Sequence, residues 1–572
     1  MTALAAPASV AKRGFGIDLS VPVLLLFAAI LCVLIVLPLA WLGYYAVTDA
    51  KGALTLANFR SLDSADFIGP LFTTFGLATL SSLLSCAVAA PMGWLVARTD
   101  MPLKRTVRLL VTASFVTPPF IGAIAWELLA APNSGLLNQL FRDLTGAAGS
   151  AHVLNIYSFS GLVFVVACYT FPYVFVLIAN ALDRTPGDLE DASAILGAGT
   201  WDTARRITIP LALPALIAGA LVAFLDAMTL FGSPAILAMP AGFHTMTTKI
   251  WSLFEFPPKE QLAAAASLPL LILTVILLRA QQAALGRRTY TVVGAKNSEP
   301  RIVRLGGYKW LALAFSFAIL MCPVFLPYFA LLNASFSKLA SHIVSVNNFT
   351  LKNVMFVFNE LSETSLAIEN TFILGILAAT IGTVLSVVIG YIGVRGAITG
   401  HRLLGFLATA PIAIPGIVLG VGLFLSYTRP PIVLYGTLWI LLIAYVTLTM
   451  PSAYQQTQSA FQAVHPELED ASRILGATRL RALWQITAPL LRNSVIATWC
   501  FIFVGVIREL SAAIMLFTSQ TKVLSVLIYD LNESGDLGAI AVLGVFMLIV
   551  TSAVVGLANT LRLGGRIPAT TR

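Results

Sequence analysis

Charged residues are scarce in this chain of 572 residues, where Asp, Glu, Lys and Arg together make up 11%. Soluble globular domains average about 25%. Hydrophobic residues account for 58% of the chain, far from the balance of a water-soluble protein. The composition therefore excludes the ordinary soluble classes and predicts a protein that crosses a membrane several times.

Motifs for chemistry are missing as well. The sequence contains no Gly-x4-Gly-Lys-Ser/Thr phosphate loop and no Gly-x-Ser-x-Gly nucleophile elbow. Its five His are scattered without metal-ligand spacing, and its five Cys lie in apolar runs where a disulfide framework is not expected. We therefore expect no catalytic site, no resident metal and no cofactor in this chain.

Long apolar runs are abundant. Each is long enough to cross a hydrocarbon core of about 30 Å, and we expect about twelve transmembrane helices. Their unbroken hydrophobicity excludes a transmembrane β-barrel, so the predicted fold is an all-α membrane protein. The runs lie near 20–46, 69–97, 107–130, 158–182, 211–233, 261–280, 309–332, 368–394, 403–427, 433–457, 491–516 and 537–560.

Basic residues exceed acidic ones and give a net charge of +9. Lys and Arg gather in alternate loops, which by the positive-inside rule places both termini in the cytoplasm. Basic loops facing anionic lipid headgroups account for the net charge, so no nucleic-acid partner is expected.

One polar segment occurs twice. Leu189–Gly197 reads Leu-Glu-Asp-Ala-Ser-Ala-Ile-Leu-Gly, and Leu468–Gly476 repeats it with one change. Both copies are followed at the same distance by Ile-Thr-x-Pro. The repeat predicts two parallel halves, residues 1–280 and 309–572, joined by a cytoplasmic linker at 281–308, with short cytoplasmic elements at 188–209 and 467–488.

Each copy is expected to form a short helix. Thr185 is placed to cap the first, and Gly197 is suited to a left-handed stop. Leu189, Ile195 and Leu196 form an apolar stripe that is predicted to lie against a hydrophobic surface, which leaves Glu190 and Asp191 free to bind a partner. The alternative is an amphipathic helix that merely covers the end of the bundle.

The two copies resemble the signature of the membrane subunits of ATP-binding-cassette (ABC) importers, a Glu-Ala-Ala helix followed at fixed spacing by Gly and by Ile-x-Leu-Pro. The resemblance implies a type I importer permease fold, and it implies that each copy docks on a separate ATPase subunit, which binds ATP and Mg. The implied coupling residues are Glu190, Asp191, Ala192, Gly197, Ile207 and Pro210 in one copy, and Glu469, Asp470, Ala471, Gly476, Ile486 and Pro489 in the other. Asp191 and Asp470 depart from the first Ala of the signature.

The chain resembles the ferric-iron branch of this family. The resemblance rests on its two fused permease halves, on Pro118-Pro119 and on the runs Tyr435–Trp439 and Arg508–Ala512. The resemblance implies import of ferric ion from a periplasmic binding protein through a bacterial inner membrane. Related branches that carry 2-aminoethylphosphonate, thiamine or polyamines stay open as alternatives.

Ionisable residues inside predicted spans are candidates for the translocation path, because burying a charge in a membrane is costly. Asp226, Arg508 and Glu509 follow the two duplicated elements and are assigned to this path, with an interhelical ion pair as the alternative. Glu127 lies near the end of its span, where a structural role is favoured. The loops Phe231–Pro240 and Ser519–Ser525 are proposed to receive the binding protein.

Two other classes remain possible from the sequence. An ion-coupled secondary transporter also has about twelve helices in two halves, but it has no need of duplicated docking elements. A membrane-embedded enzyme requires polar catalytic groups at a shared depth, which the spans lack.

Overall fold

The computed structural model describes residues 20–146, 151–185, 187–286, 301–340, 342, 347–396 and 400–563. Within these ranges the chain is almost entirely helical, and its only β-structure consists of isolated bridges. Ten helices are long and apolar enough to cross a membrane, and two bent helix pairs bring the number to twelve. The predicted all-α membrane fold is confirmed.

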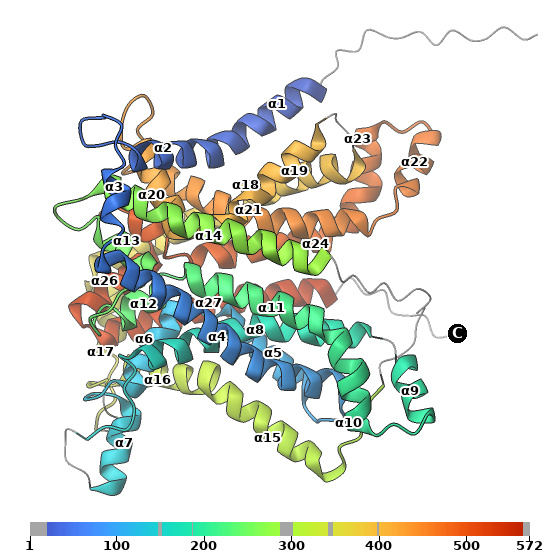
Figure 1. Cartoon of the computed structure of the whole chain (residues 1–572), viewed down its shortest axis with the longest axis horizontal. Helices are drawn as coiled ribbons and strands as arrows, with labels where there is room; N and C mark the ends of the chain where they lie inside the picture. Colours follow the sequence, from blue (N-terminus) through green and yellow to red (C-terminus); the bar gives the residue numbers. More distant parts are fainter. Residues whose placement is uncertain are drawn as a thin grey trace, which may run out of the picture.

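Two sets of helices follow one another in the same order (Figure 1). The first set is α4 (Ala65–Arg98), α5 (Lys104–Val116), α6 (Pro119–Ala130), α8 (Phe159–Arg184), α11 (Ile209–Thr229) and α14 (Glu260–Gly286). The second set is α18 (Ser362–Arg395), α19 (His401–Thr409), α20 (Gly416–Tyr427), α21 (Leu438–Gln462), α24 (Ala488–Ile507) and α27 (Leu537–Leu563). Short helices α3 (Ala57–Ser61), α7 (Leu136–Thr145) and α17 (Lys352–Met355) lie in the connections.

The third span of each set is broken, and here the prediction of continuous helices at 107–130 and 403–427 is wrong. The chain bends by 98° between α5 and α6. It bends by 109° between the helical segment that ends at Ala413 and helix α20, which begins at Gly416. Prolines are the physical reason, because a residue that precedes proline avoids the helical conformation. Thr117 before Pro118 is extended, with ψ 124°, and Ile414 before Pro415 is extended, with ψ 111°.

The extra first helix of each half packs against the core of the other half (Figure 1). Helices α1 (Ser20–Leu31) and α2 (Leu37–Ala46) lie beside the second core, where the Tyr427 hydroxyl donates to the Val33 carbonyl at 3.4 Å. Helices α15 (Lys309–Leu320) and α16 (Leu326–Phe336) lie beside the first core, where Trp126 Nε1 donates to the Cys322 carbonyl at 3.1 Å. The halves predicted from the repeat are therefore interlocked.

A short helical segment after α11 and after α24 folds back among the spans. In the first half it contains α12 (Gly232–Leu237) and α13 (Met246–Ser252), and in the second half α25 (Ala513–Leu516) and α26 (Leu524–Ser534). The Met246 amide donates to Thr74 Oγ1 at 2.8 Å, and the Leu524 amide donates to Thr371 Oγ1 at 2.9 Å. These matched bonds show that the repeat extends to individual contacts.

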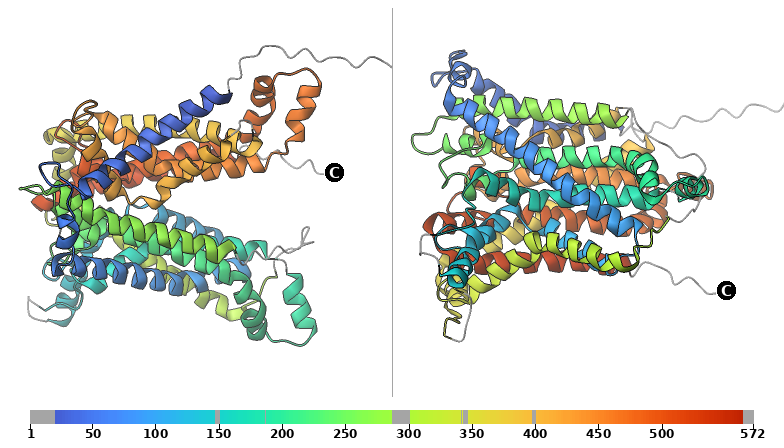
Figure 2. Two further views of the ribbon diagram at one scale, coloured as in Figure 1. Left: turned by 45° about the horizontal axis from the view of Figure 1, so that its top comes forward. Right: turned by 60° about the horizontal axis from the view of Figure 1, so that its bottom comes forward.

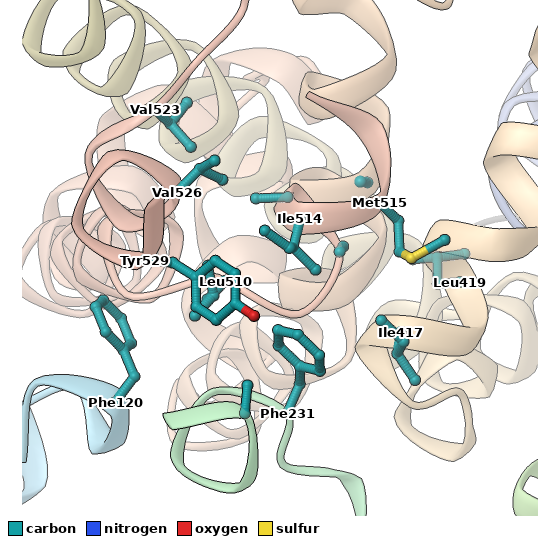
Figure 3. Close-up of a cluster of buried hydrophobic side chains, with 14 of the residues drawn as sticks. Phe120, Phe231, Ile417, Leu419, Leu510, Ile514, Met515, Val523, Val526 and Tyr529 are labelled. Carbon is teal, nitrogen blue, oxygen red and sulfur yellow. The ribbon is translucent and has the colours of Figure 1, made fainter. Parts of the chain in front are cut away.

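The two halves converge at the end of the molecule that carries these segments, which we call the closed end. Side chains from both halves form a buried apolar cluster there (Figure 3). Phe120 and Phe231 of the first half meet Leu510 and Tyr529 of the second, and all four are at most 3% exposed. The halves diverge toward the opposite end, which carries the duplicated segments 188–209 and 467–488 (Figure 2). We call it the docking end.

Candidate functional site

The duplicated segments fold into matched helical elements at the docking end (Figures 1 and 2). The first consists of α9 (Asp188–Ile195) and α10 (Thr200–Thr203), and the second of α22 (Glu467–Ile474) and α23 (Arg479–Ala482). Gly197 has φ +83° and Gly476 has φ +91°, so the predicted left-handed stops are confirmed. Beyond α10 and α23 the chain runs directly into spans α11 and α24.

Thr185 does not cap the first element. It ends α8, and its hydroxyl donates to the Ala181 carbonyl at 2.9 Å. Gly187 precedes α9 and provides no side-chain cap. The prediction was wrong because the preceding span extends two residues beyond its apolar run, to Arg184, so that Thr185 ends this span.

Glu190 points into its own half. The whole residue is only 4% exposed. Its carboxylate accepts a hydrogen bond at 2.7 Å from the hydroxyl of Thr208, which lies at the start of α11. Arg98, at the end of α4, lies 3.6 Å from the same carboxylate and donates to the Thr185 carbonyl at 2.9 Å. Glu190 thus joins the docking helix to two spans.

Glu469 repeats this arrangement with a shorter ion pair. The Thr487 hydroxyl donates to its carboxylate at 2.9 Å, and Arg395 contacts the same oxygen at 3.0 Å from Nη2 and 3.1 Å from Nε. The hydroxyl of Tyr391 lies 3.5 Å from the second oxygen. Both guanidinium and carboxylate are about nine-tenths buried, so the pair is shielded from water and salt.

The apolar stripe faces outward, which reverses the predicted orientation. Ile195 and Leu196 are 85% and 87% exposed, and their counterparts Ile474 and Leu475 are 85% and 88% exposed. Amphipathicity suggested the opposite face because nothing in the sequence shows that Arg98 stands beside Glu190. Two matched apolar tips therefore project from the docking end without a partner among the residues that the structure describes.

The remaining coupling candidates lie around these tips. Asp191 and Asp470 are exposed and contact Arg301 and Arg473 at 3.5 and 3.6 Å. The exposed Ala192, Ala471, Pro210 and Pro489 and the half-buried Ile207 and Ile486 complete the two sets.

A polar cluster lies between the halves within the spans. Asp226, on α11, lies near the Tyr173 hydroxyl and near enough to Arg508 for their charges to interact. The Arg508 guanidinium stands 5.6 Å from the centre of the Phe115 ring, which packs edge-on against Tyr173 at 5.1 Å. Arg508 belongs to the second half, so the two predicted path residues Asp226 and Arg508 are brought together across the interface.

Glu509 is held by its own loop and lies near enough to Arg508 and Asp226 for their charges to interact. Its Oε1 accepts the Ala512 amide at 2.8 Å, and its main-chain carbonyl accepts the Ser525 hydroxyl at 2.7 Å. Glu127 is remote from this cluster and accepts the Tyr157 hydroxyl at 2.7 Å. Burial and the Glu127 carboxylate raise the pKa of Tyr157, so the phenol keeps its proton and donates.

The two loops proposed to receive a binding protein are mostly inside the molecule. Phe231 and residues 232–238 are buried in the closed end. Lys522 contacts Glu363 at 2.6 Å and Asp530 at 2.8 Å. Burial alone lowers the pKa of Lys522, but the hydrogen bonds to Asp530 and Glu363 outweigh it and raise the pKa, which keeps the ammonium charged. In this state the loops brace the closed end, and only short parts of them are exposed.

Sequence reasoning missed several residues of these sites. Arg98 and Arg395 were not assigned to the docking elements, although two arginines at equivalent span ends are a usable signal. Tyr173 and Phe115 carried no comparable signal, because an aromatic residue in an apolar span is ordinarily part of the core.

Comparison with known families gives two matches along the chain. The family model described as binding-protein-dependent transport system inner membrane component matches residues 89–289 and again residues 382–561. Each match contains one docking element and the span that follows it.

Individual relatives cover most of the chain. It is 25% identical over 515 residues to the ferric transport system permease protein FbpB of Actinobacillus pleuropneumoniae, covering 88% of this chain and 71% of the relative. It is 26% identical over 478 residues to the putative ferric transport system permease protein FbpB 1 of Haemophilus influenzae, covering 81% and 70%. The molybdenum transport system permease protein ModB of Escherichia coli is 27% identical over 191 residues, which cover 33% of this chain and 80% of the relative.

Proposed function

The chain belongs to the family of binding-protein-dependent transport system inner membrane components and carries two such domains, and from this premise we propose that its cargo is ferric ion. It is a multi-pass permease subunit of an ABC importer in the inner membrane, and not itself a catalytic enzyme. We further propose that two ATPase subunits and a periplasmic binding protein complete the transporter, and that both termini are cytoplasmic.

One observation carries the proposal of two ATPase partners. Each half anchors a docking helix through a buried Glu and presents two exposed apolar residues beyond it, Ile195 and Leu196 or Ile474 and Leu475. Exposed apolar tips of this kind mark an interaction surface. Two equivalent tips at one end of the molecule fit two copies of one partner.

The choice of ferric ion rests on similarity. Relatives named as ferric transport permeases cover 88% and 81% of the chain, whereas the molybdenum transport permease covers 33% of it. Both ferric relatives also match the fused arrangement across the linker. The cargo is a substrate in transit, and we assign no resident metal site.

The geometry supports an alternating-access mechanism. The halves meet at the buried closed end and diverge at the docking end, as in a state open to the cytoplasm (Figures 2 and 3). When ATP draws the partner ATPases together, α9 and α22 approach one another, and the Glu-Thr bonds transmit this movement to α11 and α24. The apolar cluster then separates, and cargo passes the Asp226–Arg508 cluster.

The test is uptake into proteoliposomes that contain the permease, its ATPase and a binding protein. Ferric ion, 2-aminoethylphosphonate, thiamine and a polyamine are offered in separate reactions. ATP-dependent accumulation of iron alone supports the proposal. Accumulation of another cargo instead replaces the substrate assignment, and uptake without any ATPase returns the chain to the secondary-transporter class.

A further inference from the structure

A segment of the linker binds the first docking helix. Arg301 Nη1 donates to the main-chain carbonyl of Glu190 at 2.8 Å, and its Nε lies 3.5 Å from Asp191 Oδ1. The two contacts use different nitrogens of one planar guanidinium, which a lysine ammonium cannot reproduce. We call residues 301–305 the strap.

The strap is itself fixed to the end of α4. The Val303 amide donates to the Arg98 carbonyl at 2.7 Å, and the Asp100 amide donates to the Val303 carbonyl at 3.2 Å. The Leu305 amide donates to Asp100 Oδ1 at 2.8 Å. Because these bonds fix the backbone at Val303 and Leu305, Arg301 is held within reach of α9.

Beyond the strap the chain enters α15, which belongs in sequence to the second half but packs against the first. The Ser316 hydroxyl of α15 lies 3.6 Å from the sulfur of Met101. The strap therefore ties three elements together, namely the docking helix α9, the end of α4 and the first helix of the second half.

The two docking helices are anchored differently. Arg395 contacts Glu469 at 3.0 Å, whereas Arg98 lies 3.6 Å from Glu190, and its buried Nε and Nη1 make no hydrogen bond within the described residues. A cavity of about 350 Å³ opens beside this looser pair, and Arg98, Glu190, Arg301 and Val303 all line it. The strap supplies a hold on α9 where the ion pair is weak.

We infer that Arg301 is a positioning residue for energy coupling. Its guanidinium holds the main chain of the first docking helix, so coupling between ATP hydrolysis and transport through the first half depends on the linker. The inference rests on the proposed docking of an ATPase at both tips. It goes further because it makes the two docking helices mechanically unequal within one chain.

The experiment uses the full chain reconstituted with its ATPase and binding protein, after replacement of the five native cysteines. A spin label is attached at Asp188→Cys or, in a separate protein, at Glu467→Cys, which are exposed equivalent positions at the start of the two docking helices and outside the apolar tips. Arg301→Ala is expected to increase label mobility at position 188 without changing it at position 467. Cargo moved per ATP hydrolysed is expected to fall about threefold, since one of several anchors is lost.

Two matched variants test the geometry. Arg304→Ala removes the same charge from the same strap at an exposed position and is expected to behave as the parent protein. Arg301→Lys keeps the charge but not the two-nitrogen contact, and is expected to give an intermediate coupling ratio. A merely structural charge effect would make Arg304→Ala and Arg301→Ala alike.

The outcomes separate this inference from the proposed function. If neither label responds to addition of the ATPase in the parent protein, ATPase docking itself is wrong. If both labels respond but Arg301→Ala changes neither mobility nor coupling, or changes both positions equally, the strap inference is overturned while ATPase docking stands.

Discussion

At the scale of single residues, the buried carboxylates Glu190 and Glu469 are internal anchors, and their partners decide how much each contributes. Glu469 accepts from Thr487 and pairs closely with Arg395, and little of this pair reaches water. Removing one member leaves a buried, unpaired charge, which costs about 3–5 kcal/mol. Glu190 stands farther from Arg98, at 3.6 Å, so the direct attraction that depends on its charge is weaker, although this pair is buried more deeply.

We therefore expect Glu469→Gln to reduce ATP-driven transport more strongly than Glu190→Gln. The first should lower transport by more than tenfold and the second by less. Transport by proteoliposomes at equal protein density measures both. The double variant Glu469→Gln with Arg395→Gln should recover part of the loss, because it removes both charges together. Equal losses for the two single variants would contradict this account.

Asp226 and Arg508 make a second prediction at this scale. Asp226→Asn keeps the shape of the side chain and its contact with Tyr173 but removes the charge that faces Arg508. Transport is expected to fall while assembly with the ATPase, measured by co-purification, stays unchanged. Loss of both together would assign Asp226 to folding of the interface, and unchanged transport would remove it from the path.

At the scale of elements, the docking helices show what sequence can predict and where it stops. Their existence, their duplication and their glycine stops follow from local rules, and the structure confirms them. Their orientation does not, because the arginine that draws Glu190 inward lies about ninety residues earlier in the chain, and only the fold brings it near. Pro118 and Pro415 are present in the sequence, but the long apolar runs around them predict continuous helices and not the bends that the structure has.

Glycine at the end of each docking helix gives a prediction for the element. Gly197 and Gly476 have left-handed backbones with no neighbouring atom within 4 Å of an added Cβ. Valine there would meet only backbone strain, about 1–2 kcal/mol. We expect Gly197→Val with Gly476→Val to leave the bundle folded and to raise the ATP consumed per cargo several-fold. Gly199→Val, equally open but without a positive φ, is the control and should couple normally.

The exposed tips give another prediction for the element. Ile195→Asp with Ile474→Asp should abolish co-purification of the ATPase, because a charge replaces the apolar contact at both surfaces. Folding should be unaffected, since both side chains are already 85% exposed. Leu144→Asp, at a residue 77% exposed on α7, changes an apolar surface residue elsewhere and should retain the ATPase. Retention by the double tip variant would refute docking through these residues.

At the scale of the whole molecule, two opposite ends are coupled through rigid spans. The repeat and the spans were predictable because both are patterns of neighbouring residues in the sequence. The interlocking of the first helices was not, because it depends on contacts between residues far apart in the chain. That exchange matters mechanically, because α16 lies against the first core while the chain that precedes it holds the first docking helix. Movement at the first docking helix is therefore transmitted to helices of both halves.

Gly232 tests this coupling from the closed end. A Cβ at this position would stand 2.7 Å from the Phe120 Cβ of the same half and 3.2 Å from Leu510 Cδ2 of the other half, so a larger side chain would press on the contact between the halves. Gly232→Val is expected to force the apolar cluster apart and to favour the state that is open at this end. Spin labels at Ile195→Cys and Ile474→Cys should then approach one another without ATP.

Gly307→Val is the matched control, because a Cβ there meets nothing within 4 Å, and it should leave the label distance unchanged. The variant at Gly232 also separates two views of the molecule. If the halves rock as rigid bodies about their interface, opening one end must close the other. If the labels stay apart while a cysteine placed at Leu510 becomes reactive to an impermeant reagent, the closed end moves as a local gate, and the docking helices do not drive it directly.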